Sequence, residues 1–142
     1  MSTVVGTDFT GTWVTARVEG EINEYMTAAG VGMIQRNLAA VGNYGVGRAR
    51  QKIAMAADRL SCTIEVTGGW SDRTFSLTMD GSEQEVPGGF PGRPKWDGEG
   101  ALVITTDEPP SVMRRTLSSA GEMVVVLSCG GHQATRYFTK EE

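Results

Sequence analysis

The chain has 142 residues and a formal net charge of −4, from 13 basic and 17 acidic side chains. A single domain most often holds about 100–150 residues, so we expect one domain over residues 1–142. Hydrophobic residues make up 39% and charged residues 21%, a globular composition that excludes disorder and collagen-like repeats. The mild acidity argues against nucleic acid as a partner, because phosphate binding needs a basic surface.

One stretch, Glu21–Val41, has helical periodicity. Apolar residues recur there at steps of three and four: Ile22, Tyr25, Met26 and Ala29, then Val31, Ile34 and Leu38. Gly30 and Gly32 interrupt the pattern where one helix would end and another begin. Each piece is too short to be stable alone in water, so both must pack on something larger. The pattern predicts a helix-turn-helix lid over about residues 21–42.

Almost all of the remaining chain has the pattern of β-strands. Turn-forming dipeptides recur at fairly even intervals: Ala57-Asp58, Gly68-Gly69, Asp80-Gly81, Gly88-Gly89, Asp97-Gly98, Pro109-Pro110, Ala120-Gly121 and Gly130-Gly131. The runs between them are about 7–10 residues long, which is strand length. With Phe9–Val18 before the helices, they make about ten strands. An antiparallel sheet of that size must curl to protect its edges, so we predict a mainly β fold, a ten-stranded up-and-down β-barrel capped by the lid.

Two arginines fall on the face of the last strands that is otherwise apolar. Alternation gives that face Met113, Arg115 and Leu117, then Met123, Val125 and Leu127, then Ala134, Arg136 and Phe138. A guanidinium keeps its proton, so a buried one needs an anionic partner. No inward carboxylate is evident in these strands. Either a ligand carboxylate is that partner, or the phase is shifted and both arginines lie on the surface.

Segments at both ends of the chain form a recognisable pattern: Phe9-Thr10-Gly11-Thr12-Trp13, Glu24-Tyr25-Met26, Ala28-Ala29-Gly30-Val31-Gly32, Gln35-Arg36, Leu38-Ala39, and Met123 to Glu141 with Ala134-Thr135-Arg136-Tyr137-Phe138. They resemble the intracellular lipid-binding protein family, the cytosolic fatty-acid- and retinoid-binding proteins of the calycin superfamily. The resemblance implies a clam-shaped barrel around a water-filled cavity. It also implies that the helix-turn-helix covers the portal through which a fatty acid or similar apolar acid enters.

The resemblance also suggests site residues. Arg136 matches the arginine of the family's R-x-Y (or R-x-F) carboxylate-binding motif, with Phe138 in the tyrosine's place, and Arg115 matches a second cavity arginine. The cavity and portal positions are Ile22, Tyr25, Met26, Val31, Ala39, Trp70, Phe75, Leu77, Met113, Leu117, Val125 and Leu127. For each of these apolar residues singly, plain core packing is as good an interpretation as ligand contact.

The implied function is non-covalent binding and intracellular transport or buffering of a long-chain fatty acid. Two alternatives stay open. The same fold could bind another apolar acid, such as a retinoid, bile acid or bilin, which only the cavity width would discriminate. It could also serve as a structural or protective protein without a specific ligand.

We expect no catalytic activity, cofactor or metal site. His132 is the only histidine and lies beside a turn, while Cys62 and Cys129 lie far apart without metal-ligand spacing. Both cysteines are expected to be reduced core side chains. The first residues lack the basic-then-apolar order of a secretory signal, and no apolar run approaches the roughly 20 residues of a membrane span. We therefore expect a cytoplasmic monomer whose membrane contact is transient at most.

The segment Val86–Pro94 departs from the family in its content of glycine and proline. Proline has no N–H to donate to a neighbouring strand. We therefore expect the strands in this segment to be short or frayed.

Overall fold

The computed structural model describes residues 6–69 and 72–141. Its strands are β1 (Gly11–Gly20), β2 (Arg50–Met55), β3 (Ser61–Thr67), β4 (Arg73–Thr78), β5 (Gln84–Val86), β6 (Phe90–Trp96), β7 (Leu102–Asp107), β8 (Pro110–Leu117), β9 (Met123–Cys129) and β10 (His132–Glu141). Its helices are α1 (Ile22–Ala28), α2 (Met33–Val41) and the short 3₁₀ helix η1 (Asn43–Gly45). In the described part of the chain, no helix is long and apolar enough to cross a membrane.

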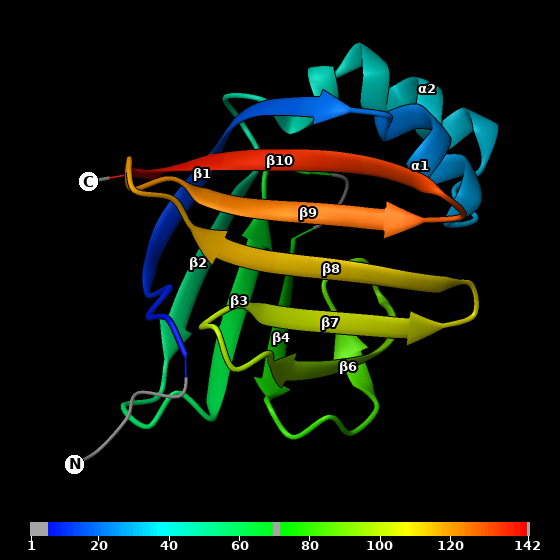
Figure 1. Cartoon of the computed structure of the whole chain (residues 1–142). Helices are drawn as coiled ribbons and strands as arrows, with labels where there is room; N and C mark the ends of the chain where they lie inside the picture. Colours follow the sequence, from blue (N-terminus) through cyan, green and yellow to red (C-terminus); the bar gives the residue numbers. More distant parts are fainter. Residues whose placement is uncertain (1–5, 70–71, 142) are drawn as a thin grey trace.

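The strands form one antiparallel sheet in the order β4-β3-β2-β1-β10-β9-β8-β7-β6-β5. Each strand pairs with its neighbour in sequence, except that β1 also pairs with β10 and that β4 and β5 are the two ends of the order. The sheet curls on itself, and the two helices lie at one end of it (Figure 1). The predicted fold, a nearly closed ten-stranded β-barrel with a helix-turn-helix, is therefore confirmed.

A bulge in β1 separates the part of this strand that pairs with both β2 and β10 from the part that pairs with β10 alone. β1 pairs with β2 only over its first residues, from Gly11 to Val14, but follows β10 as far as Gly20. The register shifts between Thr15 and Arg17, which places an extra residue in β1 and bends the strand away from β2. The bend carries the chain towards α1.

Side chains link β4 and β5, the two ends of the sheet order. The side-chain amide of Gln84 donates to the carbonyl oxygen of Thr78 at 2.7 Å and accepts from its N–H at 2.8 Å, as a peptide group would. An ion pair between Arg73 and Glu85 adds a second link. Ordinary backbone pairing is replaced here by side-chain contacts. We refer to this line between β4 and β5 as the seam.

The strands of the Gly/Pro-rich segment differ from each other. β5 has three residues, as expected of a short strand, whereas β6 runs for seven residues despite Pro91 and Pro94. β6 pairs with β5 over Phe90–Gly92 and with β7 over Arg93–Trp96. β6 thus pairs first with β5 and then with β7 along its length. Pro91 lies within the pairing with β5 and Pro94 within the pairing with β7, one on each side of the change of neighbour.

The turn after α1 has a geometry that only glycine adopts easily. The N–H of Val31 donates to the carbonyl of Met26 at 2.9 Å, and the N–H of Gly30 donates to that of Thr27 at 3.1 Å. This pair of bonds defines a Schellman C-cap, and Gly30 has the positive φ of 87° that it requires. Val31 and Met26 both pack against the core, so the cap fixes where the chain leaves α1.

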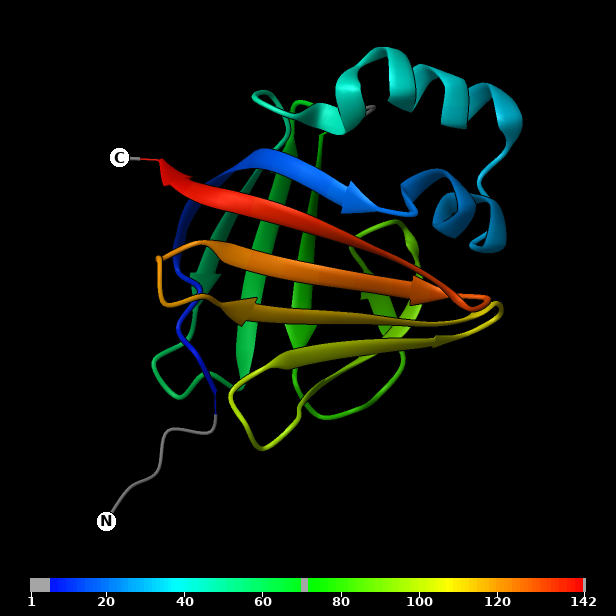
Figure 2. The same ribbon diagram turned by 45° about the horizontal axis from the view of Figure 1, so that its top comes forward.

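The two helices are held to the barrel very differently. Tyr25 and Met26 of α1 are buried, whereas no residue of α2 is. Met33, Ile34, Leu38 and Val41 of α2 are all more than half exposed. Figure 2 shows α2 farther from the strands than α1.

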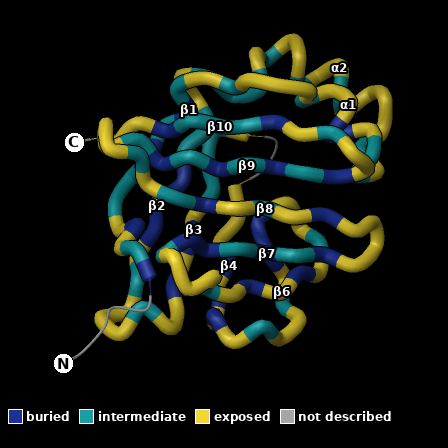
Figure 3. Tube along the Cα trace, viewed as in Figure 1, coloured by how far each residue is buried: buried dark blue, intermediate teal, exposed yellow. Residues whose placement is uncertain are grey.

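Burial alternates along the strands and defines the inward face of the barrel (Figure 3). One buried apolar cluster draws on α1 and on all of the strands except β6 and β8, which contribute only the partly buried residues Phe90, Trp96 and Met113. The buried polar or charged residues are Thr15, Gln51, Thr106, Ser111 and Arg115. Three of them, Thr15, Gln51 and Arg115, belong to the candidate site.

Candidate ligand-binding site

Arg115 and Arg136 lie in one row across three neighbouring strands. Arg115 of β8 is opposite Val125 of β9, which is opposite Arg136 of β10. Residues directly opposite each other in an antiparallel pair share a face of the sheet. Since Val125 is buried, the row faces the interior, and two guanidinium groups are brought together inside the barrel.

Arg115 is anchored on the far side of the barrel. Its side chain is 4% exposed, and its Nη1 donates to Oε1 of Gln51 at 2.7 Å. The same nitrogen lies 3.2 Å from the sulfur of Met123. β8 and β2 are separated by three strands in the sheet order, so the bond between Arg115 and Gln51 crosses the interior.

Arg136 is anchored closer to its own strand. Its Nη2 donates to Oγ1 of Thr15 at 3.2 Å, while that hydroxyl donates to the carbonyl of Ala49 at 3.0 Å. The guanidinium carbon also lies 4.8 Å from the centre of the Phe138 ring, a cation–π distance. Thr15 and Phe138 are fully buried, which places the Arg136 guanidinium inside the barrel.

No carboxylate compensates these two charges among the described residues, whose ion pairs all involve other side chains. Burial, with a smaller contribution from the nearby charge of Arg136, lowers the pKa of Arg115 to about 10. Burial likewise lowers the pKa of Arg136 to about 10. Both groups are therefore still positively charged at neutral pH, and the protein carries two uncompensated charges in its interior.

Several donors of this pair are free within the described residues. Arg115 donates hydrogen bonds through Nη1, and Arg136 donates one through Nη2. The other guanidinium nitrogens of both residues form no hydrogen bond with a described group. Yet no fully buried side-chain nitrogen or oxygen there is without a partner. The free N–H groups therefore border accessible space, and Arg136 is accordingly only half-buried although it faces inward.

Helix α1 contributes a tyrosine close to the pair. Tyr25 is 8% exposed, and its burial raises the pKa of its hydroxyl, which the charge of Arg136 partly opposes. Of the other predicted portal residues, Ile22, Val31 and Ala39 are partly buried and pack against the core, as buried Met26 does. All five of these lid residues thus belong to the buried apolar cluster or pack against it.

The predicted cavity residues on the strands vary in burial. Phe75, Leu77, Val125 and Leu127 are buried, and Met113 is partly buried. Leu117, at the end of β8, is 37% exposed and lies at the margin of the inward face. Trp70 lies outside the described residues.

The sequence reasoning missed the polar partners of the arginines. Gln51 and Thr15 face inward, as does Cys62, whose pKa burial raises to about 11 while the charge of Arg115 opposes the rise. Alternation along β2 was a usable signal for Gln51. Gln51, Ile53 and Met55 fall on one face, and Arg50 and Lys52 on the other.

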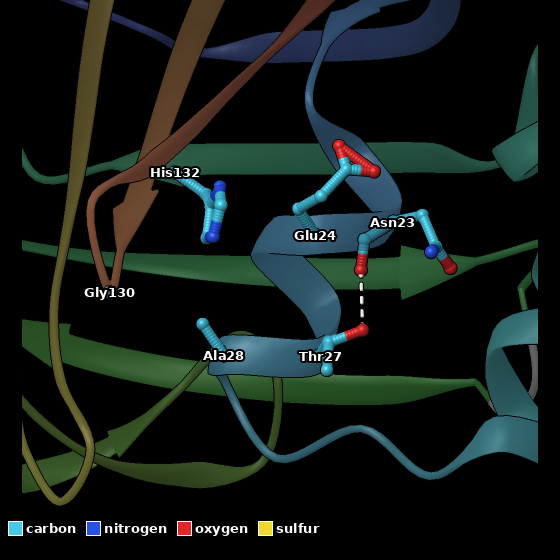
Figure 4. A pocket seen from close by; sticks show the side chains of 6 residues that line it. All are labelled: Asn23, Glu24, Thr27, Ala28, Gly130 and His132. Carbon is cyan, nitrogen blue, oxygen red and sulfur yellow. Dashed lines mark hydrogen bonds between the residues drawn. The ribbon is translucent and has the colours of Figure 1, made fainter.

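An open pocket of about 280 Å³ lies apart from the arginine pair (Figure 4). It is formed by α1 and the turn between β9 and β10, and is lined by Asn23, Glu24, Thr27, Ala28, Gly130 and His132. His132 lies 3.2 Å from Glu21 in an exposed pair. In the part of the chain that the structure describes, no group of three His, Cys, Asp or Glu side chains could hold a metal ion.

Comparison with known proteins gives a consistent result at the level of structure. The REP1-NXSQ fatty acid transporter superposes with a TM-score of 0.78 at 24% identity, over 95% of this chain and 97% of that one. A tyrosine-to-phenylalanine mutant of that transporter gives a TM-score of 0.76 at 25% identity, over 94% and 98%. No family model matches the chain, and neither does any curated protein.

The barrel, its helix-turn-helix and this likeness support the resemblance to the lipid-binding calycins. The chain is similar in structure to a fatty acid transporter over nearly the full length of both chains. The resemblance predicted from the two ends of the sequence is therefore confirmed at the level of structure.

Proposed function

We propose that this protein binds a long-chain fatty acid non-covalently inside the barrel, and transports or buffers it, with the carboxylate held by Arg115 and Arg136. The observation that carries the proposal is the pair of charged, inward guanidinium groups without a carboxylate partner among the described residues. An anion is the missing component of such a site. A carboxylate on an apolar chain supplies it.

The free guanidinium donors fit a carboxylate well. A carboxylate accepts several hydrogen bonds at once, and charge-assisted bonds to arginine are among the strongest in proteins. A buried charge without compensation costs several kcal/mol, so a bound anion would relieve a cost that the unliganded protein carries. The headgroup would thus be selected by charge as well as by geometry.

The rest of the ligand would be held by apolar surface. Side chains such as Phe75, Leu77 and Leu127 are buried on the inward face and offer such surface. Transfer of an acyl chain from water yields about 0.8 kcal/mol per methylene before ordering costs are subtracted. In this proposal the chain supplies most of the affinity, and the arginines select acids over alcohols and esters.

The test compares an acid with its matched alcohol. Delipidated protein is loaded with a neutral fluorescent probe such as Nile red, which is then displaced by oleate or by oleyl alcohol. We expect oleate to displace the probe at lower concentration. Arg136→Gln should weaken oleate by about tenfold or more, the loss of one charge-assisted bond, and leave the alcohol nearly unchanged.

Arg114→Gln is the matched control, because Arg114 neighbours Arg115 but is exposed and pairs with Asp97 at 2.9 Å. It removes the same charge from outside the barrel and should change neither ligand. Equal losses of acid and alcohol in Arg136→Gln would contradict the carboxylate role. If oleate is preferred over the alcohol but displaces the probe only at high concentration, the ligand would instead be another apolar acid, such as a retinoid, bile acid or bilin. Weak, unselective binding of many lipids would favour a protein without a specific ligand.

A further inference from the structure

Gln51 lies on the wall of the barrel opposite Arg115 and accepts a hydrogen bond from it. It lies in β2 between Trp13 of β1 and Val66 of β3 in register, and is 6% exposed. Its Oε1 is the only described oxygen that accepts a hydrogen bond from Arg115, at 2.7 Å. Gln51 therefore holds the guanidinium from the opposite wall of the barrel.

The charge of this partner matters as much as its position. Glutamine and glutamate have nearly the same shape, and a glutamate here would form a buried ion pair with Arg115. The amide instead accepts the hydrogen bond and adds no charge. Cys62, which also lies close to Arg115, has its pKa raised by burial to about 11 and is likewise neutral at neutral pH. Arg115 is consequently fixed in place but left uncompensated.

The side-chain amide of Gln51 also has hydrogen-bond donors that no described residue uses. The Nε2 group of Gln51 forms no hydrogen bond with another described residue. Its two N–H groups lie on the same side chain that orients Arg115. A carboxylate bound to Arg115 would find a neutral donor next to the charged one.

We propose that Gln51 is a specificity-determining residue for the ligand headgroup: it positions Arg115 across the barrel while leaving its charge for an anionic ligand. The inference rests on the proposed function. It adds that selection of acids depends on a neutral partner in β2 as well as on the two arginines. A carboxylate at this position would replace the ligand's carboxylate and turn the site towards neutral lipids.

The experiment measures the ratio of the dissociation constants for oleyl alcohol and oleate, by Nile red displacement, in wild type and two variants. Gln51→Glu should lower that ratio by about tenfold to a hundredfold, because its carboxylate competes with that of the ligand while the alcohol still binds. Lys52→Gln is the control. It changes the net charge by the same amount from the exposed face of β2 and should leave the ratio unchanged.

A third variant, Gln51→Met, tests the positioning role separately and serves if Gln51→Glu does not fold, as judged by circular dichroism. It keeps the length of the side chain but replaces the amide oxygen with a thioether sulfur, a much weaker acceptor for the bond from Arg115, so the affinity for oleate should fall several-fold and that for the alcohol should not. A wild-type protein that binds oleate and oleyl alcohol equally would overturn both the proposed function and this inference. A wild-type preference for oleate that survives in Gln51→Glu and Gln51→Met, as in Lys52→Gln, would overturn only the role of Gln51.

Discussion

Arg115 and Arg136 show at the scale of single residues how a barrel interior can be prepared for an anion. Each keeps a positive charge where water is scarce, and each is tied by one neutral oxygen, from Gln51 or Thr15. Neutral partners orient a guanidinium without cancelling its charge. The two side chains are therefore held in place while their charges stay available.

The pKa values of these arginines predict how binding depends on pH. A bound carboxylate favours the charged guanidinium, so the liganded protein keeps its protons to higher pH than the free protein does. The affinity for oleate should be constant between about pH 7 and 9 and fall as the pH rises through about 10, where the free arginines begin to lose protons. Nile red displacement across this range measures it.

Oleyl alcohol is the control for this pH series, because its binding does not involve a charge. Its affinity should stay level while circular dichroism shows the barrel folded. A parallel decline of acid and alcohol would indicate alkaline unfolding in place of arginine titration. An oleate affinity that is level through pH values well above about 10 would contradict the role of the arginine charges.

The same residues show how far the sequence could predict the site. Alternation in the last strands predicted that Arg115 and Arg136 face inward, and the structure has both guanidiniums inside. Their contact with a ligand stays a prediction. Gln51 and Thr15 were not anticipated, because the bond from β8 to β2 joins residues that no local period relates, and the bulge in β1 alters its alternation after Thr15.

At the scale of elements, turn chemistry and short helical periods were the most reliable signals. Turn-forming dipeptides, most of which contain glycine, marked the hairpins, and Gly30 marked the break between α1 and α2. The length of β6 was harder to predict. Its prolines suggested a frayed strand, but they fall where β6 changes from one neighbour to the other, a feature of sheet register that the segment's composition does not reveal.

Gly30 supplies a prediction about the lid. Gly30→Ala should destabilise the protein by about 1–2 kcal/mol, because alanine is strained at positive φ. A Cβ at this position would meet no atom within 4 Å, so backbone strain is the whole effect and no clash contributes. Urea unfolding of the two proteins, compared at equal slope, measures the difference.

Gly32→Ala is its matched control, two residues along the same turn. Gly32 has a φ of −66°, which any residue adopts, and a Cβ there also meets open space. We expect a change within about 0.5 kcal/mol, since the stiffer unfolded chain offsets the loss of glycine at the start of α2. Equal effects of the two substitutions would mean that the cap of α1 does not hold the lid.

At the scale of the whole molecule, side chains join distant parts of the barrel at two places. The bond between Arg115 and Gln51 crosses the interior, and the Gln84 amide joins the ends of the sheet at the seam. Neither follows from strand periodicity. The sheet thus behaves as a closed surface although its hydrogen-bonded order has two ends.

The seam can be tested by hydrogen exchange. Gln84→Leu removes the acceptor of the Thr78 N–H, so we expect exchange of that amide to accelerate by about tenfold or more in NMR experiments. Gln133→Leu, an exposed position on β10, should leave the Thr78 amide protected. Unchanged exchange of Thr78 in Gln84→Leu would show that the seam is held by other contacts.

The pairing of β1 with β10 also governs the order in which the barrel can assemble. Every other pairing joins strands that follow each other in the chain, so most hairpins can form early from local segments. Beyond Thr15, however, which bonds Ala49 and Gly47 through its backbone, β1 has no described strand neighbour but β10, and the backbone groups that pair with β10 must stay hydrated until residues 132–141 have been synthesised. On the ribosome the nascent barrel is therefore incomplete at its middle until β10 emerges, and Arg136 arrives in the same step that closes it.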